Sequence, residues 1–308
     1  DAQTGTVGTS VAADNMLDYV STFPVVLQNG NYMRNVDPVG ADQEAKLAIG
    51  ATDIRATDPT TVVSFYLNTY MDWEQNDLHQ LMVSHYQHLW LRNKYDQPVC
   101  IRGQPVFDLS KQAMRDLWVQ TVDNATKAVD SGGVPLFRAH FADRANALPK
   151  GAAGYNLSND EVVSGGRRLG QVDFPGVPQA DAATGFYDIS TLTCVEAAGM
   201  FQFTNEYYEA FANGQAQTLQ EAQRVLTRNS NGFLISNNNA TEMVGGRHFE
   251  KWLNEDYSSE PLIWESIHAV QLHEARGQYV FAHAGEPCKS DDDDGDNPHP
   301  YDVFWWVG

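Results

Sequence analysis

Short apolar runs that end in polar residues recur along the chain. Residues 23–30, 62–72 and 134–143 have this character, which predicts buried strands that deliver polar side chains at their ends. Residues 89–92 and 99–102 flank Asp96-Gln-Pro98 and predict a small hairpin or excursion. Further strands are predicted over residues 106–109, 232–239, 246–252, 278–285 and 303–308.

Apolar positions at helical spacing separate several of these runs. A helix is predicted from Ser110, a good N-cap, through Met114 and Val122, with Gly132-Gly133 as its end. Residues 144–190 are rich in Gly, Pro, Asn and Asp and show no clear period. So long a connection is usually functional. Further helices are predicted over Cys194–Ala212, Thr218–Leu226 and Leu262–Arg276.

Strands that alternate with helices predict an α/β fold with a parallel sheet. The doubly wound nucleotide-binding versions lose their main signature, because the chain has neither GxGxxG nor GxxxxGK[ST]. About seven or eight strands in a chain of this length match a (β/α)₈ TIM-type barrel. We therefore predict one barrel domain over residues 1–308, with a long loop insertion at about 144–190.

The last predicted strand, residues 303–308, reaches the end of the chain. The barrel helix that should follow this strand is missing. Three explanations are open: processing removed the helix, the count of N-terminal strands is off by one, or a partner chain or self-association covers the C-terminal edge of a barrel that lacks its last helix.

Composition excludes several classes of partner. The chain is 42% hydrophobic and 11% aromatic, which is enough to build a sizeable core. It carries 40 acidic and 20 basic side chains, a net charge of −20. Because nucleic-acid binding depends on Lys and Arg that neutralise phosphates, we expect no nucleic-acid partner. No apolar run approaches the roughly 18–20 residues of a membrane span, so we expect no membrane insertion.

Several features predict a secreted or extracellular glycoprotein. The sequence begins with Asp1 and not Met, as after removal of a signal peptide. Glycosylation is predicted at Asn124, Asn156 and Asn239, each of which begins an N-x-[ST] triplet. The cysteines, Cys100, Cys194 and Cys288, allow one disulfide and a free thiol in a secreted protein, or three thiols in a cytosolic one.

The predicted strand ends are rich in carboxylates, amides and aromatic rings. In a barrel these ends converge on one face, where active sites lie. Amides and carboxylates bind sugar hydroxyls, and aromatic rings stack on the apolar faces of sugars. Glycoside hydrolysis needs two carboxyl groups across the scissile bond, and Asp143 and Glu250 end separate strands. The predicted substrate-binding residues are Asn68, Tyr70, Asp72, Trp73, Glu74, Asn237, Asn238 and His283.

Two of these predictions have structural alternatives. Asp72 and Glu74 also fit an exposed turn after the strand, and His283 also fits a core histidine.

The sequence offers two candidate metal sites. One is the closely spaced set His79, His85 and His88, for which a surface helix is favoured because the HExxH pattern is absent. Asp291–Asp296 lacks the spacing of a calcium loop. We therefore predict no metal site and no cofactor.

Several short motifs resemble those of the glycosyl hydrolase barrel families. Val106-Phe-Asp-Leu-Ser-Lys-Gln-Ala-Met-Arg-Asp-Leu-Trp118 and Val134-Pro-Leu-Phe-Arg-Ala-His-Phe-Ala-Asp143 are similar to a strand, a helix and the next strand of those families. Leu234-Ile-Ser-Asn-Asn-Asn and Gly246-Arg-His-Phe-Glu250 are similar to later strand ends. The resemblance covers roughly residues 60–285. It implies Asp143 and Glu250 as the acidic pair, with Asp72 and Asn237 or Asn238 as sugar contacts.

The function predicted from the sequence is hydrolysis of a glycosidic bond in a poly- or oligosaccharide by a secreted enzyme. Asp143 would act as nucleophile or general base and Glu250 as general acid, or the reverse. The alternative is a non-catalytic secreted glycoprotein that uses a barrel scaffold for glycan binding or assembly. A third reading, a lyase acting on uronic polysaccharides, would need a basic neutraliser such as Arg138 or Arg144.

Overall fold

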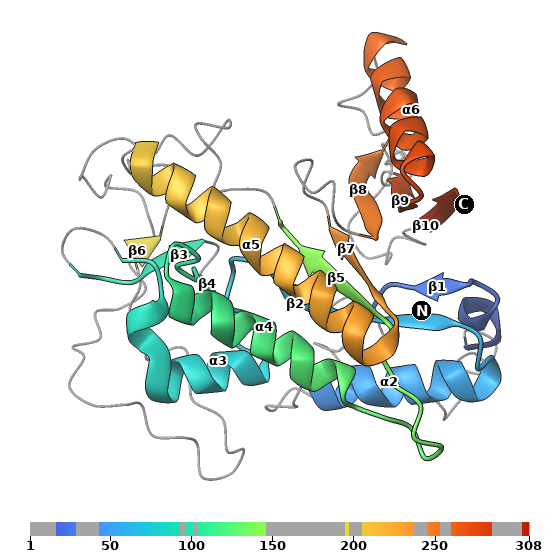
Figure 1. Cartoon of the computed structure of the whole chain (residues 1–308), viewed down its shortest axis with the longest axis horizontal. Helices are drawn as coiled ribbons and strands as arrows, with labels where there is room; N and C mark the ends of the chain where they lie inside the picture. Colours follow the sequence, from blue (N-terminus) through green and yellow to red (C-terminus); the bar gives the residue numbers. More distant parts are fainter. Residues whose placement is uncertain are drawn as a thin grey trace, which may run out of the picture.

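The computed structural model of the chain describes residues 17–28, 43–92, 96–101, 104–145, 195–196, 205–236, 245–252, 260–284 and 304–307. Its strands are β1 (Val25–Val26), β2 (Val62–Asn68), β3 (Val99–Ile101), β4 (Gln104–Pro105), β5 (Ala139–Asp143), β6 (Val195–Glu196), β7 (Phe233–Ser236), β8 (Gly246–Trp252), β9 (Tyr279–Ala284) and β10 (Phe304–Val307). Its helices are α2 (Gln43–Thr57), α3 (Asp77–Leu81), the π-helix η3 (Met82–Tyr86), the 3₁₀-helix η4 (Gln87–Leu89), α4 (Gln112–Thr126), α5 (Asn205–Ser230) and α6 (Glu260–Ala275) (Figure 1).

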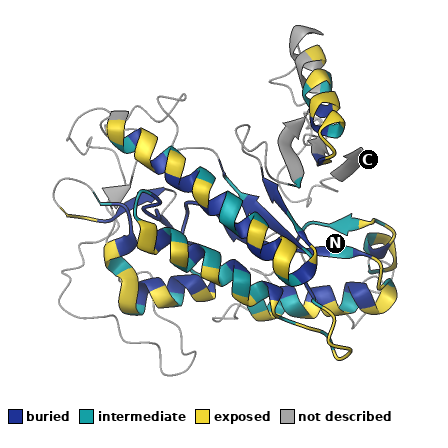
Figure 2. Ribbon diagram, in the orientation of Figure 1, coloured by how far each residue is buried: buried dark blue, intermediate teal, exposed yellow. Residues whose placement is uncertain are grey.

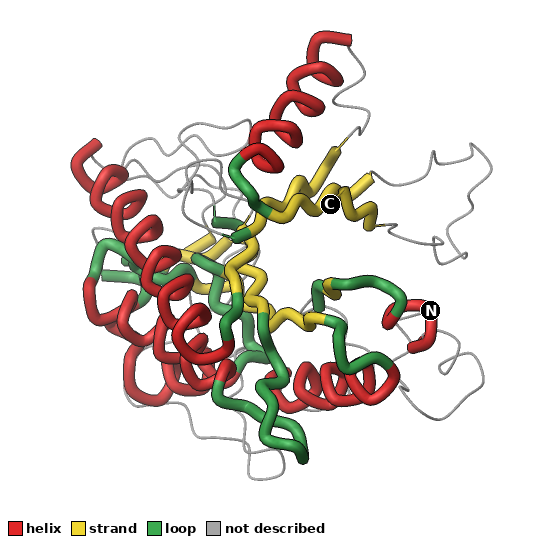
Figure 3. Tube along the Cα trace, turned by 45° about the vertical axis from the view of Figure 1, so that its right-hand side comes forward, coloured by secondary structure: helices red, strands yellow, loops and turns green. Residues whose placement is uncertain are grey.

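A seven-stranded sheet in the order β1-β2-β5-β7-β8-β9-β10 organises the described residues. Every neighbouring pair from β1 to β9 is parallel, which confirms the predicted parallel α/β class. The strands follow a curved path, with the helices outside the curve (Figure 3). β1 and β10 are the two edges of this sheet, so the described strands form an open, partly barrel-like sheet. The closed barrel of eight strands stays a prediction.

The last strand runs against the expected direction. β10 pairs antiparallel with β9, with Phe304 opposite His283 and Val307 opposite Val280. The prediction of a final parallel barrel strand over residues 303–308 was therefore wrong in direction, although a strand is present. An apolar run looks the same in either direction, so its sequence does not reveal its orientation.

The two faces of the sheet have different surroundings. Phe65 of β2 pairs with His140 of β5, and both rings lie on the face covered by α4. On this face the ring centroids of Trp118 and His140 are 5.2 Å apart. Tyr66 and Phe141, the next residues on β2 and β5, belong to the opposite face, because side chains alternate along a strand. Strands β2, β5 and β7 are almost fully buried and form an inner layer (Figure 2).

Helix α5 replaces the two helices predicted over Cys194–Ala212 and Thr218–Leu226. One continuous helix spans Asn205–Ser230, while Val195–Glu196 is a strand that pairs with β3. Gly214, which interrupts the apolar pattern, lies inside the helix. A Cβ built there would be 1.9 Å from the backbone oxygen of Leu109, so the glycine allows α5 to approach the turn before α4.

Helix α4 also differs at its ends from the prediction. Its N-cap is Lys111, not Ser110, and the helix stops at Thr126, before Gly132-Gly133. Ser110 instead donates its hydroxyl to Asp108 at 2.5 Å. The helix itself is confirmed, since its buried side chains recur at intervals of four residues: Met114, Trp118, Val122 and Thr126.

A second, three-stranded sheet has the order β4-β3-β6. The predicted hairpin or excursion around Asp96 is present as an antiparallel bridge between Arg92 and Pro98. Cys100 on β3 is part of a disulfide, whereas Cys194 and Cys288 lie outside the described residues. Among the described helices, none has the length and apolar character to cross a membrane.

Replacing Gly214 with Ala should destabilise the protein by about 1–3 kcal/mol, because the new methyl group forces α5 away from Leu109. This cost should exceed the roughly 1 kcal/mol by which Ala favours a helix over Gly. Urea unfolding measures the change. Gly132→Ala is the control, since a Cβ there meets only the Asp130 side chain at 3.2 Å. Equal stability of the two variants would contradict the close approach.

Replacing His140 with Leu should flatten the acid dependence of stability. Burial lowers the pKa of His140 from 6.5 to about 3, so its contribution is fully present above pH 6.5 and is lost as the pH falls toward 3. At about 1.4 kcal/mol per pH unit, the wild type should lose about 2 kcal/mol more than the variant between pH 7 and pH 5. Urea unfolding at both pH values tests this, with the exposed His268→Leu as control. Parallel slopes for wild type and His140→Leu would overturn the assignment.

Candidate functional site

Asp143 ends β5 at the carboxyl edge of the parallel sheet and is half-buried. Its Oδ2 atom accepts hydrogen bonds from the Tyr66 hydroxyl at 2.8 Å and the Asn68 amide at 3.3 Å. Its Oδ1 atom accepts one from the backbone N–H of Arg144 at 2.7 Å. Donors on both oxygens favour the ionised carboxylate and fix its orientation.

Tyr66, which was not among the residues predicted from the sequence, contacts the predicted catalytic carboxylate of Asp143. Burial raises the pKa of its phenol well above the usual range, and the nearby charge of Asp143 raises it further. The hydroxyl therefore stays protonated and available as a donor to Asp143. A signal was present in the sequence: Tyr66 lies two residues before Asn68 on the same strand, hence on the same face.

Asn68 connects the site to the core. Its side-chain oxygen accepts from the backbone N–H groups of Tyr70 and Met71, while its backbone oxygen accepts from the Trp118 indole of α4 at 2.9 Å. Asn68 is fully buried, with an exposed fraction of 0%. Its amide therefore shapes the turn after β2 and supports Asp143.

The pairing of strands determines where Glu250 lies relative to Asp143. Ala142 is level with Ser236, and Ser236 with Arg247, so Asp143 is level with His248 two strands away. Glu250 lies two residues further toward the carboxyl edge of β8. Spacings of about 4.8 Å between strands and about 3.3 Å per residue place the two backbones about 12 Å apart.

A β-bulge lies beside Glu250. The β8–β9 pairing shifts between Phe249 and Trp252, which face Ala282 and Ala284. His283 lies between those two partners on β9, so Glu250 and His283 occupy neighbouring positions along the edge. Bulges are frequent next to active sites, where they redirect a side chain. The structure thus brings Asp143, Glu250 and His283 to the same edge of the sheet.

Aromatic rings share the sheet face of Asp143. Tyr66 and Phe141 lie side by side with ring centroids 5.9 Å apart. Phe233 of β7 and Tyr279 of β9 stack at 4.5 Å, and both belong to this face by strand register. Tyr279 is 42% exposed. Phe233 and Tyr279 begin β7 and β9, however, so their stack lies at the amino end of the strands, away from Asp143 at the carboxyl edge.

The other predicted substrate-binding residues occupy different environments. Asp72 is fully buried, and its Oδ2 atom accepts from the Trp90 indole at 2.8 Å. Tyr70 is also buried, at 6% exposure, while Trp73 and Glu74 are half-buried. The exposed turn weighed for Asp72 is therefore not what the structure shows at this residue. Asn237 and Asn238 lie outside the described residues, and substrate contact by this group stays a prediction.

Asn124 is exposed on α4, while Asn156 and Asn239 lie outside the described residues, so glycosylation at all three stays a prediction. His85 and His88 are exposed, whereas His79 is buried. Within the described segments, no group of three or more His, Cys, Asp or Glu side chains is arranged to hold a metal ion. Asp291–Asp296 lies outside those segments.

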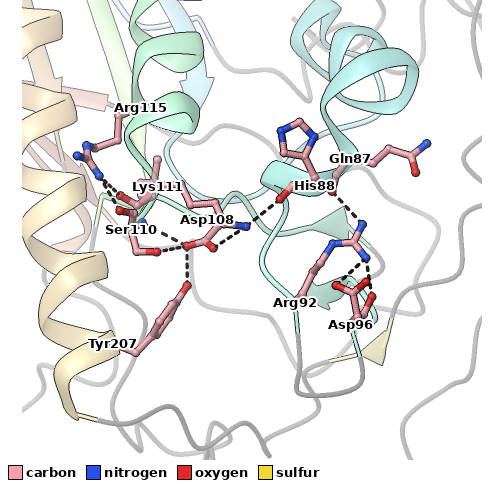
Figure 4. A network of polar contacts seen from close by, with 10 residues as sticks. Gln87, His88, Arg92, Asp96, Asp108, Ser110, Lys111, Arg115 and Tyr207 are labelled. Carbon is pink, nitrogen blue, oxygen red and sulfur yellow. Dashed lines mark hydrogen bonds and ion pairs between the residues drawn. The ribbon is translucent and has the colours of Figure 1, made fainter.

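Asp108, another strand-end carboxylate, is held by a network of polar contacts (Figure 4). Its Oδ1 accepts from the hydroxyls of Tyr207 at 2.7 Å and Ser110 at 2.5 Å, and its Oδ2 lies 3.1 Å from Lys111 Nζ. Burial and the Asp108 charge raise the pKa of Tyr207, so its phenol remains a donor. These contacts join the start of α5 to the turn before α4, and Asp108 therefore serves the fold.

The solved structures to which this chain is similar include two alpha-galactosidases, both at low similarity. The galactosidase domain of the alpha-galactosidase-sucrose kinase AgaSK has a TM-score of 0.42 and 11% identity, over 92% of this chain and 32% of that chain. The alpha-galactosidase TtGalA from Thermus thermophilus has a TM-score of 0.42 and 12% identity, over 86% and 46%. No protein-family model and no curated protein matches the sequence. The chain thus spans less than half the length of either structure.

Replacing Tyr66 with Phe should destabilise the protein by about 1–3 kcal/mol, because it removes a donor to a charged, half-buried carboxylate. Urea unfolding at pH 7 measures the loss. Tyr19→Phe is the matched control, since Tyr19 is 57% exposed and should tolerate the change. If both variants are equally stable, the Tyr66–Asp143 hydrogen bond does not contribute to the fold.

Proposed function

We propose that the protein is a carbohydrate-active enzyme that hydrolyses a glycosidic bond, with Asp143 and Glu250 as its carboxyl pair. The observation that carries this proposal is the environment of Asp143. Its two oxygens accept hydrogen bonds from Tyr66, Asn68 and the backbone of Arg144, at the carboxyl edge where parallel α/β sheets bind ligands.

In the proposed reaction Asp143 acts as the ionised partner, either as nucleophile or as general base. The donors around it stabilise its negative charge, which suits either role. Glu250, two strands away on the same edge, acts as the general acid. The strand register puts the two backbones about 12 Å apart. The mechanism requires the two carboxyl groups to lie roughly 5 to 9.5 Å apart, so both side chains must reach toward the sugar ring for this pair to act.

A poly- or oligosaccharide is the substrate class that fits the surrounding residues. Sugar rings expose apolar C–H faces that stack on aromatic side chains. Tyr66 and Phe141, whose ring centroids are 5.9 Å apart, are aromatic residues next to Asp143 on the same face of the sheet. His283 and the predicted amides Asn237 and Asn238 would complete the hydrogen bonding to hydroxyl groups.

We further propose that the protein is secreted and glycosylated. The disulfide at Cys100 supports an oxidising compartment, since cytosolic proteins rarely keep disulfides. Exposed Asn124 supports glycosylation, because its side chain is accessible on the surface of α4.

A panel of oligo- and polysaccharides incubated with the protein tests the proposal, with released reducing ends as the readout. Cleavage is expected, and Asp143→Asn and Glu250→Gln should each lower it by about 10²–10⁴-fold, the usual contribution of a catalytic acid or base. Asp96→Asn is the control, because the Asp96 side chain is 88% exposed. Full activity in either of the first two variants would exclude the proposed pair.

Two other outcomes identify other functions. Glycan binding without cleavage would favour the non-catalytic glycoprotein. Unsaturated products would identify a lyase, which Arg144 makes a specific alternative: its cation lies close enough to the Tyr66–Asp143 pair to lower the pKa of Tyr66 in opposition to the carboxylate. In a lyase, Arg144→Gln should abolish formation of the unsaturated product.

A further inference from the structure

A second group of polar side chains lies in the interior, beyond the end of β2. Asp72 precedes α3, Asn76 is the N-cap of this helix, and His79 lies in its first turn. All three have an exposed fraction of 0%. The apolar side chains of Leu78 and Met82 on the same helical segment are buried with them. None of the three contributes to the proposed carboxyl pair.

The Asp72 carboxylate uses only one of its oxygens. Oδ2 accepts from the Trp90 indole at 2.8 Å and lies 3.0 Å from His79 Nδ1, although the ring is not turned to form a linear hydrogen bond. The His79 ring lies nearly parallel to the Trp90 indole, with centroids 6.2 Å apart. Within the described part of the chain, Asp72 Oδ1 has no hydrogen-bond partner.

Asn76 and His79 also present unused polar atoms. Among the described residues, neither atom of the Asn76 amide nor Nε2 of His79 has a hydrogen-bond partner. The position of Asn76 makes this notable, because an N-cap side chain usually bonds to the helix backbone and this one does not. The carboxylate, the amide and the imidazole therefore all require hydrogen-bond partners, and the three lie within one loop and the first turn of α3.

Leaving these atoms without partners would be costly. Each buried, unpaired polar atom costs about 1–3 kcal/mol, and native proteins pair about 90% or more of such atoms with protein or water. Buried water molecules typically make about three hydrogen bonds to groups that are otherwise unsatisfied. The loop offers that combination: acceptors in Asp72 Oδ1, Asn76 Oδ1 and His79 Nε2, and a donor in Asn76 Nδ2.

We propose that Asp72, Asn76 and His79 form an internal hydration site that binds at least one ordered water molecule. The chemistry of the three side chains favours water over an ion. The Asp72 carboxylate repels anions, and the unpaired Asn76 N–H₂ group needs an acceptor, which a water oxygen supplies and a cation does not. In addition, the described residues contain no group of three His, Cys, Asp or Glu side chains placed to hold a metal. The water completes the solvation of the buried carboxylate and ties α3 to the segment that follows β2.

A crystal structure of the full chain at high resolution tests the site. We expect a density peak about 2.6–3.2 Å from an Asn76 amide atom and from either Asp72 Oδ1 or His79 Nε2. Direct pairing of the three side chains with one another, with no peak between them, would overturn the proposal. A peak with coordination distances of about 2.0–2.4 Å would identify a metal instead and would also overturn it.

Asn76→Leu provides the solution test, with Asn124→Leu as the matched control on the exposed surface of α4. Because the Asn76 side chain makes no capping hydrogen bond, its replacement leaves the backbone contacts of α3 in place. Magnetic relaxation dispersion of water counts long-lived internal water molecules. This count should fall by at least one in Asn76→Leu and stay unchanged in Asn124→Leu. An unchanged count in Asn76→Leu would contradict the site, and if that variant does not fold, the wild-type crystal structure decides.

Discussion

The arrangement of the protein depends on the order in which its parallel strands join the sheet. From β1 to β9 each new strand pairs with the one before it in the sheet, and the order never reverses. Parallel strands are connected by right-handed crossovers, so an order that never reverses places the connecting helices on one face. Trp118 of α4 packs on that face against His140. Asp143 lies on the opposite face, at the carboxyl edge of the sheet.

The site and the core are linked through β2. Asn68 donates its amide to Asp143, while its backbone oxygen accepts from the buried Trp118 indole. Tyr66, one step earlier on the same face, supplies a phenol that burial keeps protonated. The Asp143 carboxylate is thus held by side chains of β2, and α4 packs against the other face of this strand.

Buried polar groups are treated in three different ways in this fold. Asp108 is satisfied by protein donors from the turn before α4 and from Tyr207 of α5. His140 lies among aromatic rings and stays neutral, because burial lowers its pKa to about 3. Asp72 is only partly satisfied by protein groups, which is why an internal water molecule is the natural completion. In each case, no buried charge is left without a compensating interaction.

The sequence by itself determined the parallel α/β class, the main strands and the helix of Trp118, because these depend on local periodicity and on runs of apolar residues. It also placed Asp143 correctly at the end of a strand, whereas Glu250, predicted at a strand end, lies inside β8, two residues before its last residue. It gave no sign that Asp72 is buried or that β10 runs antiparallel. It also predicted two helices, one ending at Ala212 and one beginning at Thr218, where the structure has the single helix α5. Only the tertiary structure decided these points. Burial, strand direction and close backbone approach are set by contacts between segments far apart in the chain, and such contacts leave no periodic pattern in either segment alone.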